Sequence, residues 1–210
     1  MKNIVMSVCI LAGVCQLSAS PVDIMVGSRG YGFGGAYGAL VDDPSAAYWN
    51  PGALGRVEHM TILESNWLFQ DVENVNVNYL AFGLPVPYVG TIGGSWLLNH
   101  ATLEEGREQV TKSASWNMFT LSAGRTLGEK LWILRTPSVG FSIDRYTFLV
   151  QDDKNGAGLG FNLGFWTMFP YDISFGFTAR NMGADMMGEK ILPAYRLGIG
   201  HTITFQSMHR

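Results

Sequence analysis

The sequence predicts an all-β fold, an antiparallel transmembrane β-barrel of about eight strands preceded by a short helical segment. The prediction depends on an export signal, on repeated alternation of residue types with a period of two, and on a shortage of charge. Charged residues make up 15% of the 210 residues, whereas an ordinary soluble domain has about 25%. A chain with so little charge is not expected to meet water on every side.

The first 20 residues are typical of a signal peptide. Lys2 provides the positive start, residues 4–14 are apolar, and residues 17–20 are mostly small, as at a cleavage site. A membrane anchor is the alternative, but this apolar run is shorter than the about 20 residues that span a bilayer. We therefore expect export, with cleavage after Ala19 because Pro21 disfavours a cut after Ser20.

Residues that carry chemistry are scarce in the mature chain. Both cysteines, Cys9 and Cys15, fall inside the signal, and lipid modification of Cys15 is the alternative to their removal. The four histidines stand singly, and the chain has neither a nucleophile elbow nor a P-loop. We expect no enzyme activity, no cofactor and no metal site. The Lys and Arg residues, 14 in all, are scattered among 17 acids, which argues against nucleic-acid binding.

From residue 57 to residue 210 the chain breaks into short alternating segments, which predict strands. We place eight of them, at 61–69, 75–84, 91–98, 116–125, 139–150, 160–169, 173–180 and 195–205. Turn residues separate them, at 85–87, 104–106, 127–130, 152–158, 170–172 and 181–190.

The two faces of these segments differ in an unusual way. In residues 160–169, Phe161, Leu163 and Phe165 form one face, and Gly, Asn and Trp residues form the other. A soluble β-sandwich, the alternative fold, carries Lys and Glu on its wet face, whereas here the second face is Gly, Ser, Thr and Asn. This pattern favours a wall with lipid outside and a crowded or narrow polar interior. Aromatic residues near strand ends are candidates for interfacial girdles, with scattered core positions as the alternative: Trp67, Phe69, Trp96, Trp132, Phe169 and Tyr195.

Residues 21–56 have a different, glycine-rich composition without alternation. Residues 30–35 satisfy the dinucleotide-binding pattern G-x-G-x-x-G, but they follow an export signal rather than a buried strand, and no acid stands about 20 residues later. We interpret the glycines as positions of close backbone packing.

Three runs of this segment stand at a characteristic spacing: Gly34-Gly35-Ala36, the acidic pair Asp42-Asp43, and Asn50-Pro51 followed by Gly52-Ala53-Leu54. Together they resemble the N-terminal signature of the PorV/PorQ-type outer-membrane proteins, which are relatives of the FadL fatty acid transporters. Residues 121–124, 156–164, 180–183 and 192–198 resemble the family as well, and Gly52-Ala53 departs from its usual Ala-Gly.

The resemblance implies a FadL-like barrel with residues 21–56 tucked inside as a hatch. Asp42, Asp43 and Asn50 are then expected to cap short helical turns or to bond to the wall, with Asp43 as a helix cap and Pro44 at the first helical position. Candidate partners for the acids inside the lumen are Arg29, Arg180 and Arg196, and the alternative is that each arginine meets solvent at a rim.

FadL barrels have more strands than the eight counted here, so we expect either a reduced or a truncated barrel, and closure stays open. The resemblance implies an outer-membrane protein that passes small hydrophobic molecules across the outer membrane. The alternative within the family is a non-enzymatic membrane component that interacts with secreted or surface proteins. The expected partners are therefore the lipid bilayer, a hydrophobic small molecule, and other proteins.

Overall fold

A computed structural model of the chain describes residues 24–68, 75–105, 110–150, 155–186 and 189–202. The expected signal peptide, residues 1–20, lies outside these ranges, as do both cysteines and Phe69. Among the described helices, none is long and apolar enough to cross a bilayer.

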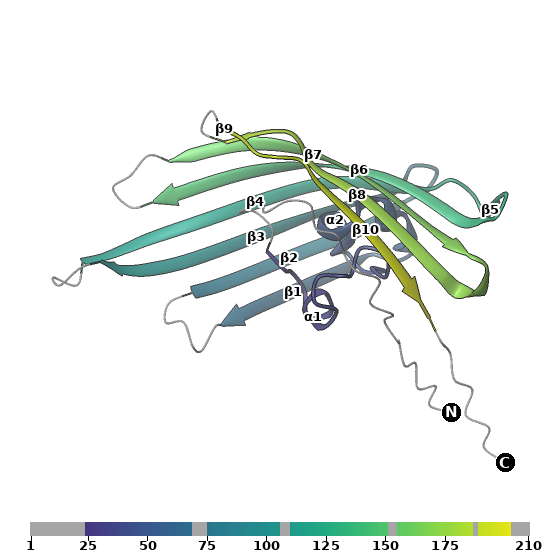
Figure 1. The fold of residues 1–210 in the computed structure, drawn as a ribbon, viewed down its shortest axis with the longest axis horizontal. Coiled ribbons are helices and arrows are strands. Elements are labelled where there is room, and N and C mark those ends of the chain that lie inside the picture. The colour runs from purple at the N-terminus through teal and green to yellow at the C-terminus, as the bar shows by residue number, and fades with distance from the viewer. Residues whose placement is uncertain (1–23, 69–74, 106–109, 151–154, 187–188, 203–210) are drawn as a thin grey trace, which may run out of the picture.

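The fold is one antiparallel sheet with a short helical segment ahead of it, which confirms the all-β prediction (Figure 1). The helical elements are α1 (Ser28–Gly32), α2 (Ala46–Trp49), η1 (Pro51–Arg56) and η2 (Pro170–Asp172). The strands are β1 (Thr61–Leu68), β2 (Val75–Val86), β3 (Gly90–Glu105), β4 (Val110–Thr126), β5 (Lys130–Leu131), β6 (Leu134–Val150), β7 (Gly156–Phe169), β8 (Ile173–Met186), β9 (Glu189–Lys190) and β10 (Ala194–His201).

The sheet pairs in the order β1-β2-β3-β4-β6-β7-β8-β10, and the short strands β5 and β9 extend the ends of β6 and β8. The eight strands of the main path are the eight that the alternation predicts. Strands β5 and β9 escape sequence analysis because two residues are too few for a periodic signal.

Several predicted turns are displaced because the strands run further than their alternation indicates. Strand β8 continues to Met186, so the predicted turn at 181–190 begins too early. Similarly, β7 already begins at Gly156, inside the predicted turn at 152–158. Pro85 and Val86 belong to β2, and the turn itself occupies residues 87–89, where Tyr88 has a φ of 67°. At 127–130, Lys130 is already paired in β5.

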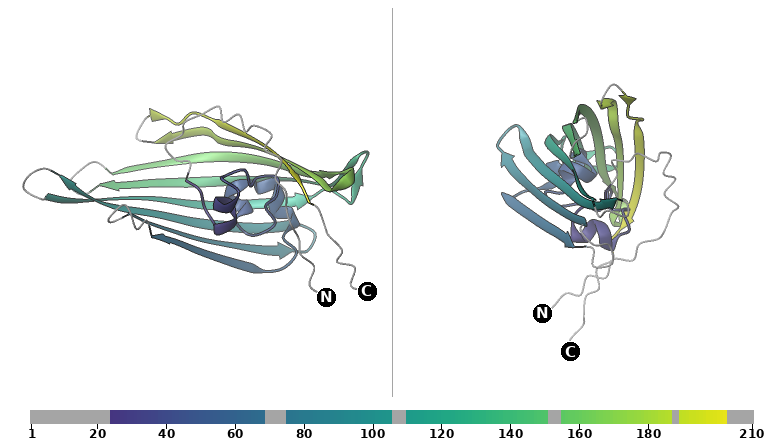
Figure 2. Two further views of the ribbon diagram at one scale, coloured as in Figure 1. Left: turned by 60° about the horizontal axis from the view of Figure 1, so that its bottom comes forward. Right: turned by 90° about the vertical axis from the view of Figure 1, so that its left-hand side faces the viewer.

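The sheet is strongly curved, and the N-terminal helices lie inside the curve (Figure 2). The predicted faces of β7 are confirmed: Phe161 and Leu163 are about half exposed on the convex side, whereas Asn162 and Gly164 are buried on the concave side. Trp96, Trp132 and Tyr195 are exposed, whereas Trp67 packs against the buried core, which is the alternative left open for these aromatic residues. Its position in β1 has the phase of the inner face, opposite the buried Val77.

Strands β1 and β10 are the two ends of the pairing path. Within the described ranges, no ladder joins β1 to β10, so the described sheet is not closed into a barrel.

Candidate functional site

Residues 24–57, which we name the hatch segment, lie inside the curve of the sheet and cover part of its concave side (Figure 2). The side chains of Tyr37, Trp49 and Leu54 are almost completely buried there, at 0–2% exposure. The 3-10 helix η1 packs mainly against β4, β6 and β7. The contact between the hatch segment and the inner wall is therefore an enclosed region, and we take it as the candidate site.

The inner wall donates hydrogen bonds to backbone carbonyls of the hatch segment. The indole Nε1 of Trp166 lies 2.8 Å from the carbonyl of Ala39. Hydroxyl groups make the other bonds, from Thr91 to Val57, Thr126 to Gly55, Ser138 to Gly52 and Thr178 to Trp49. Short helices leave many carbonyls without an internal partner, and these polar side chains satisfy some of them.

Asn50 joins the hatch segment to β7. Its side-chain amide donates to the carbonyls of Gly38 and Phe165, both at 3.0 Å, and its oxygen accepts from the N–H of Gly52 at 3.0 Å. The side chain is fully buried. It caps η1 and fixes that helix to the wall at the same time, so both roles expected for Asn50 are present.

Pro51 follows at the first position of η1 and lies directly on the wall. A Cβ atom placed on Gly140 or Gly164 would come under 3.0 Å from atoms of Asn50, Pro51 or Gly52. Backbone therefore meets backbone here, and only glycine leaves the necessary space.

Gly34, Gly35 and Ala36 lie between α1 and the buried part of the segment. Gly34 has a φ of 58° and Gly35 a φ of 83°. Both values fall in the left-handed region that glycine adopts without strain, so the pair lets the chain turn after α1. Ala36 borders the small cavity between this turn and β8 and β10.

The acidic pair lies near the exposed edge of the hatch segment. Arg29 pairs with Asp42, and its Nη1 lies 3.4 Å from Asp43 Oδ2. Asp43 also accepts from the Tyr37 hydroxyl at 2.9 Å and from the N–H of Ser45 at 2.8 Å. Burial, followed by the negative charge of Asp43, raises the pKa of Tyr37. Arg29 thus meets the acids as expected, but at a half-exposed rim.

The expected helix cap is shifted along the chain. Helix α2 begins at Ala46 with Ser45 as its N-cap, so Pro44 is not its first residue. The N–H groups of Ala46 and Ala47 bond back by three residues to Asp43 and Pro44, which forms a tight turn before the helix. The Asp43 carboxylate caps that turn instead.

A second set of buried polar groups lies on the inner wall behind α2. We name it the polar cluster: Thr120, Asp144, Tyr146, Asn162, Arg180 and Asn181. Asp144 is 1% exposed and accepts from Thr120 at 2.8 Å and from Asn162 at 2.7 Å. Arg180 Nη2 lies 3.9 Å from Asp144 Oδ2. These neighbours use the acceptor capacity of the carboxylate, so the cluster is suited to holding the structure rather than to reacting.

A β-bulge allows Arg180 and Asn181 to face inward together. The register between β7 and β8 shifts between Phe161 and Leu163, and Asn181 has a φ of 58°. Its N–H donates to the Asn162 side chain at 2.9 Å, and its own oxygen accepts from the Tyr146 hydroxyl at 2.7 Å. An extra residue in one strand turns a second side chain to the same face.

Two arginines connect the wall to α2. The guanidinium of Arg180 lies 4.3 Å from the ring centroid of Tyr48, and that of Arg196 lies 5.2 Å from a ring of Trp49. Arg180 is buried in the interior and Arg196 is partly buried, so neither lies fully in solvent at a rim. The acid beside Arg180 is Asp144 of the wall, however, so its expected pairing with Asp42 or Asp43 is wrong.

Sequence analysis missed Asp144, Tyr146 and Asn162 as site residues. A signal existed for Asp144, because it is a charged residue in phase with Gly140 and Ser142 on the face that carries small side chains. Among the described residues, no group of three or more His, Cys, Asp or Glu is placed to hold a metal ion.

Comparisons with protein-family models, with curated proteins and with solved structures found no match.

The first prediction concerns the glycine contact. Gly140→Val is expected to lower the free energy of unfolding by about 1–3 kcal/mol, because a larger side chain overpacks the Pro51 contact. Gly32→Ala is the control, since a Cβ there meets nothing within 4 Å. Urea unfolding of the detergent-folded protein, followed by tryptophan fluorescence, measures both. Equal stability of the two variants would contradict the close contact.

The second prediction concerns the buried ion pair. Asp144→Ala or Arg180→Ala is expected to cost about 3–5 kcal/mol, because each removes one charge of a buried ion pair and leaves the other charge buried. The double variant is expected to lose less than the sum of the single losses. The half-exposed pair Arg29 and Asp42 serves as the control, with an expected coupling of about 0–1 kcal/mol. If the losses of unfolding free energy at Asp144 and Arg180 are additive, the proposed coupling is contradicted.

Proposed function

We propose that the chain is an outer-membrane protein of the FadL-like barrel type, in which the curved sheet spans the bilayer around the hatch segment. We further propose that it passes small hydrophobic molecules across the outer membrane. The observation that carries the proposal is the exposed apolar outer face of the sheet, together with a buried inner face that holds polar and charged side chains such as Asp144, Asn162 and Arg180.

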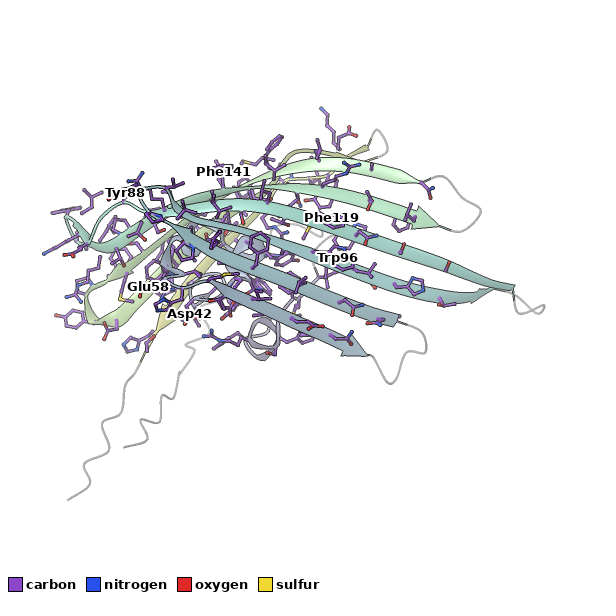
Figure 3. The ribbon with its side chains drawn as sticks, turned by 180° about the vertical axis from the view of Figure 1, so that it is seen from behind. Asp42, Glu58, Tyr88, Trp96, Phe119 and Phe141 are labelled. Carbon is purple, nitrogen blue, oxygen red and sulfur yellow. The ribbon has the colours of Figure 1, made fainter. Side chains whose placement is uncertain are left out.

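The convex face carries an exposed apolar surface over most strands. Leu121, Phe141 and Leu197 are 52–60% exposed, which is costly in water at about 25 cal/mol per Å² of apolar area. An extended exposed apolar surface indicates contact with a membrane or with a protein partner. Figure 3 views this face, where Trp96, Phe119 and Phe141 are labelled. Its further members include Leu80, Phe82, Leu84, Ile92, Val139, Ile143, Leu159, Phe161, Leu163, Tyr195 and Ile199.

This surface has the height of a membrane band. Along β4 the outward positions Ala123, Leu121 and Phe119 are apolar and lie between Arg125 and Asn117. The two polar residues are eight positions apart, which is about 26 Å along a strand at about 3.3 Å per residue. A tilt of about 40° reduces this to roughly 20 Å, close to the about 25 Å apolar band of outer-membrane barrels.

Exposed aromatic side chains mark one border of the band. Tyr88, Trp132 and Tyr171 are 85–96% exposed at the turns that join β2 to β3, β4 to β6, and β7 to β8. Amphipathic rings of this kind concentrate at membrane–water interfaces. They favour a lipid environment over the soluble β-sandwich.

The resemblance of residues 34–54 to the PorV/PorQ-type proteins favours transport of small hydrophobic molecules. The hatch segment packs against the inner wall at β4, β6 and β7, so passage there requires that it move away from the wall. The contacts that hold the hatch segment to the wall are noncovalent and can break and form again. They are the hydrogen bonds to carbonyls, the Asn50 hydrogen bonds, and the ring contacts of Arg180 and Arg196.

The third prediction tests the membrane band. Ile143 pairs with Leu121 at the middle of the band, and Thr147 pairs with Asn117 at its border. Ile143→Arg is expected to lower the stability of the protein in lipid vesicles by about 2–4 kcal/mol, whereas Thr147→Arg on the same strand costs about 0–1 kcal/mol. Urea titration in vesicles, read from the heat-dependent shift on detergent gels, measures the difference. Equal costs, together with wild-type protein that stays in the supernatant when membranes are pelleted, would favour the soluble sandwich.

The fourth prediction tests passage. In Ala39→Cys/Gly198→Cys the new side chains join the hatch segment to β10, because the Cβ positions lie 3.1 Å apart. A disulfide needs about 3.8 Å, so small adjustments suffice. We expect the oxidised variant to reduce uptake of labelled fatty acid by liposomes to the level of empty liposomes, and a reductant to restore it.

The matched control for this lock is Gly160→Cys/Ala184→Cys, which joins β7 to β8 with Cβ positions 3.2 Å apart and leaves the hatch segment free. Its uptake is expected to stay at the wild-type level. If inserted wild-type protein takes up no more fatty acid than empty liposomes do, transport is refuted.

A second candidate is a non-enzymatic membrane component that binds secreted or surface proteins. The ends of the described pairing path at β1 and β10 favour it, because the free side of a terminal strand offers backbone groups to another strand. Protein that inserts normally but transports nothing would favour this candidate over passage.

A further inference from the structure

The hairpin end between β4 and β6 differs from the rest of the outer face in its charge. Arg125, Lys130 and Arg135 are exposed there, and Lys130 pairs with Arg135 across the hairpin. Glu129 is the acid that accompanies them. Exposed apolar side chains lie beside these cations, at Leu127, Leu131, Trp132 and Ile133. Cations next to apolar and aromatic groups are suited to a surface where lipid headgroups begin.

A depression of about 420 Å³ lies on the outer face next to this end. The small residues Ala123, Gly124 and Gly140 form its floor, and Val139, Phe141 and Leu163 line its apolar sides. Arg125 lies at its border and pairs with Val139 across β4 and β6. The volume is within the about 300–1,000 Å³ typical of ligand pockets.

The depression thus offers an apolar trough with a cation at one end. Its lining matches a molecule with a hydrocarbon chain and an anionic head, and its place on the apolar band exposes it to the membrane rather than to the lumen. We propose that this depression is a binding site for an anionic phospholipid, with an acyl chain against Phe141 and Leu163 and the phosphate at Arg125. The proposal rests on the membrane insertion proposed above.

Charge decides which phospholipid the site prefers. Each Lys or Arg near an anionic surface contributes about 1 kcal/mol, which corresponds to about fivefold in affinity. A zwitterionic headgroup brings the same phosphate but adds a cation of its own beside Arg125, Lys130 and Arg135. The site is therefore expected to favour phosphatidylglycerol over phosphatidylcholine, whose acyl chains are alike.

The fifth prediction follows from this preference. The full mature protein is reconstituted in phosphatidylcholine vesicles that contain spin-labelled phosphatidylglycerol or spin-labelled phosphatidylcholine, and the immobilised fraction of each label is measured by electron paramagnetic resonance. We expect a preference for phosphatidylglycerol that falls about fivefold in Arg125→Gln, by the contribution of one cation. Ala123→Phe fills the floor and is expected to reduce the site-bound fraction of both labels.

Each variant has a matched control on the outer face. Arg145→Gln removes an exposed cation from β6 opposite Phe119, outside the lining of the depression. Ala157→Phe adds the same ring at an exposed alanine of β7. Both are expected to keep the wild-type preference. An unchanged preference in Arg125→Gln, or an equal loss in Arg125→Gln and Arg145→Gln, overturns the site in favour of diffuse charge.

Insertion separates the failure of this site from the failure of the proposed function. A heat-dependent shift on detergent gels and resistance to carbonate extraction show that each variant is folded and inserted. Inserted protein without a lipid preference overturns the lipid site alone. Protein that does not insert overturns the membrane proposal, and the lipid site with it.

Discussion

The hydrogen bonds between inner-wall side chains and hatch-segment carbonyls are the interaction on which the rest of the fold depends. A polar inner face buried without partners would cost the desolvation of each group. The chain resolves this with its own N-terminal segment, whose short helices present carbonyls that helices cannot satisfy internally. Trp166, Thr178 and Ser138 each supply a donor to one of these carbonyls. Because the inner face forms the buried core together with the hatch segment, the outer face can carry apolar side chains.

This division explains the glycines as well as the polar residues of the wall. A core of large side chains would leave no room for the hatch segment, and Gly140 and Gly164 allow Pro51 and Asn50 to lie on the backbone of the sheet. Further along the strands the wall instead carries larger groups, among them Tyr146 and Met118, which are almost completely buried. Residue size on the inner face therefore follows the shape of the segment that it covers.

Much of the fold was accessible from the sequence because a period of two is a local property. Phe161 and Leu163 alternate with Asn162 and Gly164, and this alone assigns their faces. The inward direction of Asn181 was not accessible in this way, because it arises from a bulge that depends on the neighbouring strand. For the same reason the partner of Arg180 was assigned wrongly. Asp144 lies on a different strand, and sequence distance does not show which strands are neighbours.

The contacts of the hatch segment are unevenly distributed, and this bears on how it can move. Helix η1 is held by Asn50, by Ser138 and by backbone contact with three strands, all of it buried. Helix α1 meets the wall through the rings of Tyr31 and Trp67. Its pair of Arg29 and Asp42 lies at a half-exposed rim and contributes about 0–1 kcal/mol. Local opening begins where few buried contacts must be broken. If the proposed passage takes place, we expect a path along the inner wall to open first at the α1 end, with η1 staying in place.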